Sequence, residues 1–194
     1  MKRLVCCFIC ILLLLAGTIS IAEEPRTDTG IWKLKAYSDE FGMPTDEKYV
    51  VSGVCVGTFS NSATTNSELY AVVFCQENRG YHQIKIRFAE YGKYIVKNTT
   101  SKNVRFDFVM MDSSGQKQYF NGLTDAFIPK KNQDMWLGND ATHAVINALK
   151  AGGTIRFAFT EQDNPHNRYV FSIEDASGFD VAYAEWIKQY GYLN

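Results

Sequence analysis

The histidines are the first residues that could support metal or acid–base chemistry, and the chain has three of them: His82, His143 and His166. None has a ligand-type partner at the i+2 or i+4 position, so zinc motifs such as HExxH are missing. The alternating acids and central glycine of a calcium loop are also missing, as is a glycine-rich loop that would hold phosphate. The sequence therefore predicts no metal site and no cofactor.

A nucleophilic serine would need an activating base. No GxSxG pattern is present, and the hydroxyl groups of residues 60–67 have no nearby His or Lys in the sequence. Asp39 and Glu40, or Glu90, could form a glycosidase pair of carboxylates, but the ~5–9 Å separation that decides this depends on the fold. We therefore expect no enzymatic activity. A secreted hydrolase acting on cell-wall or extracellular polymer is the alternative.

The stretch GTFSNSATTNSEL, residues 57–69, is rich in hydroxyl and amide side chains between two apolar runs. Its simplest interpretation is a hairpin loop whose side chains bond local backbone groups. The alternative is a loop that contacts a ligand. On that alternative, the binding candidates are Ser60, Asn61, Thr64, Thr65 and Asn66.

Trp136 is the aromatic residue best placed for recognition, because it lies in the polar segment KKNQDMWLGND. Exposed Trp and Tyr rings are suited to stacking on sugars or docking peptides. The alternative interpretation is an edge-strand residue folded over the adjacent helix. Trp32 and Trp186 are predicted to be core residues.

Strands must position these candidate residues, because most of the chain consists of short β-branched and aromatic runs separated by predicted turns. YHQIKIRF from residue 81 alternates strictly, as in an antiparallel strand with one buried face. The predicted fold is mainly β, an antiparallel β-sandwich or barrel. Its strands are expected at 31–37, 49–59, 69–75, 81–88, 94–97, 104–111, 117–121, 154–160 and 168–173.

Two short peripheral helices are predicted, over about 140–150 and 178–190. In the first, apolar residues recur at i, i+3, i+4, i+7 and i+8 from Ala141, with Asp140 as the expected cap and Gly152 as the stop. In the second, Ser177 and Asp180 have the spacing of a capping box.

The first 22 residues have the layout of a secretory signal peptide: a basic start, a short apolar core and small residues before a cleavage point after Ala22. They hold two bases, Lys2 and Arg3, and no acid, so the chain's 20 bases and 21 acids become 18 and 21, a net charge of −3. That balance does not favour a nucleic-acid partner. We expect a secreted or periplasmic product without stable membrane insertion, in which residues 23–194 form a single β-rich domain.

Cys55 and Cys75 are the cysteines that remain after this cleavage, and an oxidising compartment favours a disulfide between them. If strands 49–59 and 69–75 pair around a turn centred on Thr65, residues whose numbers sum to 130 lie opposite each other. Cys55 then faces Cys75 within disulfide reach. Two buried free thiols are the alternative.

Two parts of the chain resemble known proteins. WKLKAYSDEFGMPTDEKYV, followed by GTFSNSATTNSEL, resembles a group of secreted bacterial proteins of unknown function. The closing strand RYVFSIE and helix SGFDVAYAEWIKQY are similar in layout to the end of the invasion-associated locus B type of extracytoplasmic β-sandwich. The resemblance implies a bacterial envelope or secreted sandwich without an established activity.

The sequence thus favours a non-enzymatic extracytoplasmic module that binds a protein or glycan through loops and an exposed edge. Besides the hydrolase, a structural subunit of an envelope assembly is an alternative. Such a subunit would show an open edge strand or a large apolar patch.

Overall fold

The computed structural model describes residues 28–90, 93–94, 102–112, 114–129 and 134–190, so the expected signal peptide lies outside the described residues. The described residues form eleven strands and two helices. The strands are β1 (Lys33–Ser38), β2 (Pro44–Val51), β3 (Cys55–Ser60), β4 (Ser67–Asn78), β5 (Tyr81–Glu90), β6 (Lys93–Tyr94), β7 (Lys102–Met111), β8 (Lys117–Ile128), β9 (Asp134–Leu137), β10 (Thr154–Glu161) and β11 (Arg168–Ile173). The helices are α2 (Asn139–Ala151) and α3 (Phe179–Lys188).

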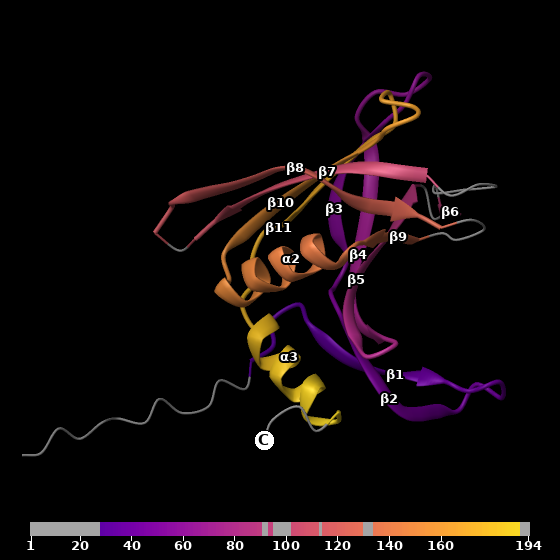
Figure 1. The fold of residues 1–194 in the computed structure, drawn as a ribbon, viewed down its shortest axis with the longest axis vertical. Coiled ribbons are helices and arrows are strands. Elements are labelled where there is room, and N and C mark those ends of the chain that lie inside the picture. The colour runs from indigo at the N-terminus through magenta and orange to yellow at the C-terminus, as the bar shows by residue number, and fades with distance from the viewer. Residues whose placement is uncertain (1–27, 91–92, 95–101, 113, 130–133, 191–194) are drawn as a thin grey trace, which may run out of the picture.

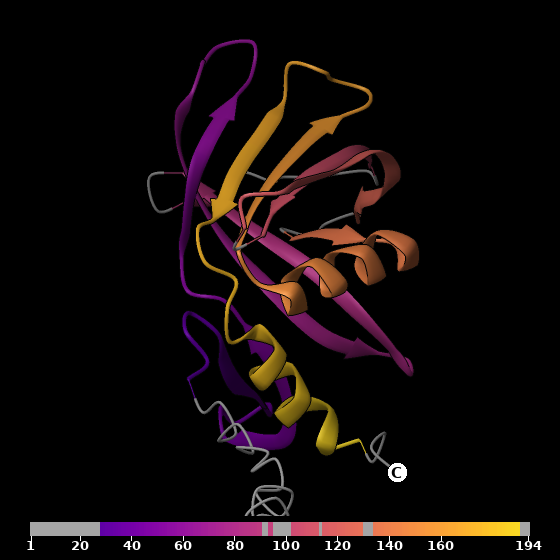
Figure 2. The same ribbon diagram turned by 90° about the vertical axis from the view of Figure 1, so that its left-hand side faces the viewer.

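Eight antiparallel strands close into a ring, in the order β4, β3, β11, β10, β7, β8, β9, β5 and back to β4. The β1–β2 hairpin continues the sheet from β4, and β6 adds to β5. This confirms the prediction of a mainly β, antiparallel fold. The β3–β4 and β10–β11 hairpins extend to one end of the molecule, while β1, β2 and α3 lie at the other (Figures 1 and 2).

The ring forms because its strands alternate apolar and polar residues. In β5 the side chains of Ile84, Ile86 and Phe88 are fully buried, as the alternation predicts. They meet a stack of aromatic rings inside the ring of strands. The buried aromatic residues of this stack are Phe59, Phe88, Phe106, Phe108, Phe157, Phe159, Tyr169 and Phe171.

Both predicted helices are present, but the predicted N-caps are wrong. Helix α2 begins one residue earlier than expected, with Gly138 as its N-cap, so Asp140 lies in the first turn. Gly178 is the N-cap of α3, and neither helix has a side-chain cap hydrogen bond. Gly152 does end α2, at a φ of 75°.

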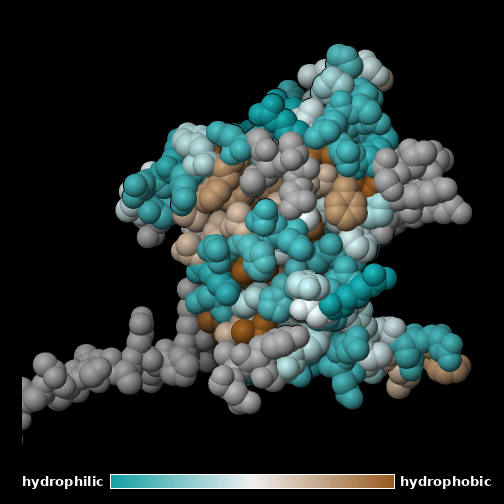
Figure 3. Space-filling view, viewed as in Figure 1, coloured by the Kyte–Doolittle hydropathy of each residue, from teal (hydrophilic) through white to brown (hydrophobic). Residues whose placement is uncertain are grey.

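The helices cover the end of the ring near β1 and β2. Helix α2 packs against β5 and β8, and α3 packs against α2, β1 and β2. Polar residues cover the outward side of α2, with apolar residues beside it (Figure 3). Trp32 and Trp186 are fully buried, which confirms their prediction as core residues. Neither described helix is long and apolar enough to cross a membrane.

The predicted pairing of Cys55 with Cys75 is wrong in its register. The expected strand 49–59 is two strands, β2 and β3, which both pair with β4 on either side of a break at residues 52–54. Cys55 lies opposite Ala71, whereas Cys75 lies opposite Val50. Four residues along β4 correspond to ~13 Å at about 3.3 Å per residue, which is beyond disulfide reach. Both cysteines are buried free thiols.

We therefore expect two free thiols per chain at these positions. Cys6→Ser, Cys7→Ser and Cys10→Ser confine the measurement to them. Thiol labelling of the denatured, unreduced variant should give two labels, and labelling of the native protein should be slow. Burial raises the pKa of both thiols, which keeps the reactive thiolate scarce. Zero labels after denaturation would contradict the register seen here.

Candidate functional site

A groove with aromatic and cationic side chains lies on the outward face of β1, β2, β4, β5 and β9. A row of three residues crosses this face of the sheet: Phe74 lies opposite Lys85, and Lys85 lies opposite Trp136. Directly opposed residues of antiparallel strands share one face of the sheet. We call this hollow of about 220 Å³ the Lys85 groove, and its lining residues are Ala36, Tyr37, Ser38, Tyr49, Phe74, Gln76, Lys85, Arg87 and Asp134.

The charged groups of the Lys85 groove are held in fixed positions. Arg87 donates two hydrogen bonds to Asp134, from Nε to Oδ1 at 2.7 Å and from a terminal nitrogen to Oδ2 at 3.0 Å. Lys85 Nζ lies 4.0 Å from the centre of the Trp136 ring. Burial lowers the pKa of Lys85; the Asp134 carboxylate opposes this shift, and the Arg87 charge adds to it. With both bases protonated, the three charged groups leave one positive charge in the groove.

Aromatic rings form one wall of the groove. The ring centres of Tyr37 and Tyr49 are 4.8 Å apart, and those of Tyr49 and Phe74 are 6.0 Å apart. Burial, followed by neighbouring tyrosine and glutamate groups, raises the pKa of Tyr37 to about 12. Its hydroxyl group therefore stays protonated at neutral pH and is available as a hydrogen-bond donor.

The structure places the recognition candidate Trp136 in a strand. It is half-buried in β9, and because β9 lies between β5 and β8 it is not at a sheet edge. Its indole N–H is buried and has no hydrogen-bond partner among the described residues. Trp136 therefore packs against Lys85 on the outward face of the sheet.

The five loop candidates form a compact turn between β3 and β4, as the simpler interpretation predicted. Asn61 Oδ1 accepts hydrogen bonds from the backbone N–H groups of Ala63 and Thr64, both at 2.8 Å. Ser60 Oγ accepts one from the Asn66 N–H at 3.0 Å. The loop also contains Thr65. Phe74 is seven residues along β4 from the loop, or ~23 Å at about 3.3 Å per residue, so the loop candidates do not reach the groove.

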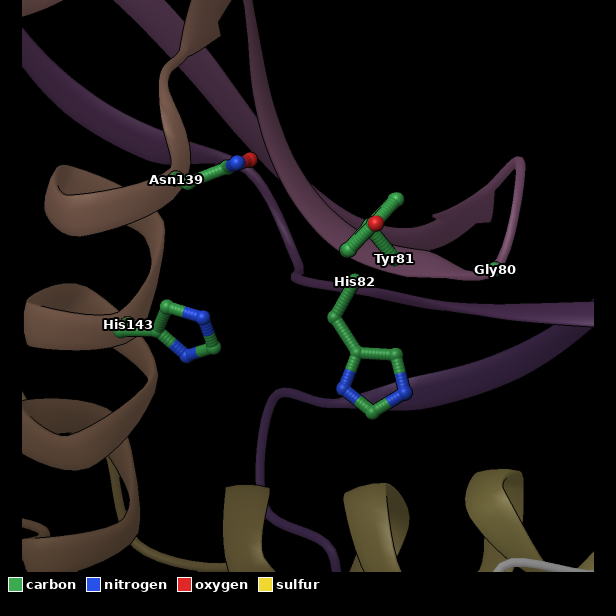
Figure 4. Close-up of a pocket in the computed structure, with 5 residues that line it drawn as sticks. All are labelled: Gly80, Tyr81, His82, Asn139 and His143. Atoms are coloured by element: carbon green, nitrogen blue, oxygen red, sulfur yellow. The ribbon is translucent and has the colours of Figure 1, made fainter.

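A second hollow, of about 240 Å³, brings together two of the three histidines. His143 points from α2 toward β5, and His82 at the start of β5 points toward α3 (Figure 4). The His82 Nδ1 and the Tyr183 hydroxyl group are hydrogen-bonded at 2.5 Å. The pKa of His82 is lowered mainly by burial, and further by the charges of Lys150 and His143.

The histidine hollow has few other polar groups among its described lining residues. Besides the two histidines, these residues are Gly80, Tyr81 and Asn139, and none of the three carries a carboxylate, a thiol or an aliphatic hydroxyl. Within the described ranges, no group of three or more His, Cys, Asp or Glu side chains could hold a metal ion. The third histidine, His166, lies far along the chain in the β10–β11 turn.

Comparisons with known proteins supply no identity for these sites. The chain matches no family model, and neither curated proteins nor solved structures show significant similarity to it. The resemblance to the invasion-associated locus B type therefore stays a prediction. The geometry of the hollows is what supports a function.

Proposed function

We propose that this protein is a non-enzymatic, extracytoplasmic module that binds glycan in the Lys85 groove. One observation carries the proposal: Tyr37, Tyr49 and Phe74 line a hollow that also contains the fixed charges of Lys85, Arg87 and Asp134. Aromatic rings offer apolar faces to the C–H groups of a sugar. Lys85, Gln76 and the tyrosine hydroxyls supply hydrogen bonds for its hydroxyl groups.

The size of the groove favours recognition of a small part of a polymer. Its volume of about 220 Å³ lies below the ~300–1,000 Å³ of pockets that enclose a drug-sized ligand. A shallow groove on a sheet is suited to a chain that passes across it. The signal peptide expected at residues 1–22 would place the protein where such polymers occur.

A hydrolase is less well supported at this groove. Glycosidases use two carboxyl groups ~5–9 Å apart. Asp134 is the single carboxylate among the described lining residues, and Arg87 engages both of its oxygens. A carboxylate paired in this way is suited to fixing the shape of the groove and the position of the Arg87 charge.

A structural role in an envelope assembly is the second candidate, and the β1–β2 hairpin favours it. Its tip exposes Phe41 and Met43, at 81% and 63% of their surface. Asp39 fixes this turn, because its Oδ1 accepts hydrogen bonds from the N–H groups of both residues. β1 is also the first strand of the sheet order, with one open edge.

The glycan proposal predicts that Tyr37→Ala and Lys85→Gln each weaken binding at least about tenfold, or ~1.4 kcal/mol. Binding is measured by calorimetry against a panel of neutral, amino and acidic oligosaccharides. Tyr81→Ala is the control, because Tyr81 is equally aromatic and 67% exposed but lies at the histidine hollow. Its affinity should match the unmodified protein. No binding to any oligosaccharide, or equal losses in all three variants, would contradict the proposal.

A further inference from the structure

A second groove lies on the opposite wall of the ring. β10 is the fourth neighbour of β5 in both directions around the closed ring, so the two strands face away from each other. Phe157 and Phe159 of β10 point inward and are fully buried. By the alternation of a strand, Arg156 and Ala158 therefore point outward.

Ala158, Val170 and the carboxylate of Asp107 form the floor of this groove, and arginines stand at its ends. Ala158 lies opposite Val170 on β11 and Asp107 on β7. Arg156 and Arg168 both line the hollow above this floor, which has a volume of about 160 Å³. Their strand positions differ by four residues, or ~13 Å at about 3.3 Å per residue. The two guanidinium groups therefore approach one hollow from opposite ends.

Neither arginine forms an ion pair in the part of the chain that the structure describes, although the Asp107 carboxylate lies in the same hollow. Arg105 on the same wall is different, because its Nε lies 3.2 Å from Asp107 Oδ2. A neighbouring hollow of about 400 Å³ shares Arg156 and Tyr119 and adds Lys117, and Glu174 is the single acid among its described lining residues. Cations thus gather along one wall of a chain whose net charge is −1.

We propose that the Arg156–Arg168 groove is a second binding site, which takes an acidic polysaccharide. Guanidinium groups bind carboxylate and sulfate oxygens in a bidentate manner, and two of them at the ends of a small floor fit successive acidic groups of a chain. Tyr119, whose surface is 63% exposed, lies level with Arg156, because both pair with Val109 of β7, and offers a ring for a sugar at this end of the groove. Nucleic acid is the less favoured polyanion, because the chain has no overall basic excess.

The test measures binding of a polyuronate to the whole protein at low salt, with neutral dextran and duplex DNA in parallel. Arg156→Gln combined with Arg168→Gln should weaken polyuronate binding at least tenfold and reduce its dependence on salt. Arg105→Gln, which removes an arginine that is already paired, should change the affinity less than twofold. Thermal unfolding checks that all variants remain folded.

Three results would overturn the proposal: no loss of polyuronate affinity in the double variant, equal binding of dextran, or tighter binding of DNA through the same arginines. Lys85→Gln separates this site from the Lys85 groove, because it should leave polyuronate binding unchanged. A loss of polyuronate affinity in Lys85→Gln, without such a loss in the double variant of Arg156 and Arg168, would also overturn the proposal. If no oligosaccharide of the panel bound in the Lys85 groove, the prediction of polyuronate binding at the Arg156–Arg168 groove would still stand.

Discussion

Gly57→Ala is expected to destabilise the protein by ~3 kcal/mol or more, and can prevent folding altogether. Gly57 on β3 lies opposite Phe171 on β11. A Cβ atom at this position would lie 2.0 Å from the Val170 carbonyl oxygen and 2.7 Å from the Phe171 Cα. These contacts are with backbone, so no side-chain rotation can relieve them. Urea unfolding followed by circular dichroism measures the free energy of unfolding.

Gly80→Ala is the matched control. Gly80 lies in the turn between β4 and β5 with a φ of +85°, and a Cβ atom there would meet nothing within 4 Å. Its substitution should destabilise the protein by only about 1 kcal/mol, from backbone strain alone. If the two variants were equally stable, β3 and β11 would not approach as closely as the structure shows. The ring would then be open at this point, and the fold would be a sandwich.

The strands themselves could be predicted because their signal is local. The alternation of β5 is visible in eight residues, and the buried residues follow it. Closure of the ring depends on which strands pair, such as β3 with β11, and these are distant in the sequence. No local sequence pattern predicts which distant strands pair. The sequence alone therefore could not distinguish a sandwich from a barrel.

The register error at Cys55 has a specific cause. Residues 49–59 form one apolar run, but Ser52 interrupts it by bonding Val73 twice: its N–H donates to the Val73 carbonyl, and its hydroxyl accepts from the Val73 N–H. The residues between Ser52 and Cys55 shift the pairing by one position relative to β2. The turn is also centred two residues before the expected Thr65. Such a break is a bulge, and the sequence shows only a glycine at position 53 to suggest it.

The Lys85 groove was found only in part from the sequence. The sequence singles out Trp136, which packs against Lys85, whereas Lys85 and Arg87 lie in the alternating run YHQIKIRF, which predicts only a strand. A usable signal was Phe74, because the alternation of β4 places this large apolar residue on the outward face. That Tyr37 faces it from β1 depends on the β1–β2 hairpin pairing beside β4. The two histidines of the second hollow are 61 residues apart and meet only because α2 packs against β5.

Lys102→Met is expected to destabilise the protein by ~3–5 kcal/mol at pH 7, because it leaves a buried carboxylate without its counter-charge. The Glu161 side chain is only 4% exposed, and Lys102 Nζ lies 2.6 Å from its Oε2. The Tyr169 hydroxyl donates to the other oxygen at 2.8 Å. Without Lys102, that single hydrogen bond would have to stabilise the buried charge.

Two further variants test whether the loss of stability in Lys102→Met comes from the unpaired buried charge of Glu161. Arg105→Met removes an exposed pair with Asp107 and should cost at most about 1 kcal/mol. Lys102→Met combined with Glu161→Gln removes the stranded charge and keeps an acceptor for Tyr169. This double variant should be more stable than Lys102→Met alone, because the unpaired buried charge is gone. An equal or lower stability would contradict the electrostatic explanation.

The pH dependence gives an independent check of the same contact. The hydrogen bond to Glu161 raises the pKa of Lys102 above its ordinary value of 10.5. The folded state therefore binds this proton more tightly than the unfolded state does. The resulting stability is complete below pH 10.5 and is lost as the pH rises through the folded-state pKa. Burial also raises the pKa of Tyr169, but this contribution is present in both proteins. The difference in stability between the unmodified protein and Lys102→Met should thus narrow above pH 10.5. If this difference stayed constant as the pH rose, packing of the lysine stem, and not its charge, would be what holds this end of β7 to β10.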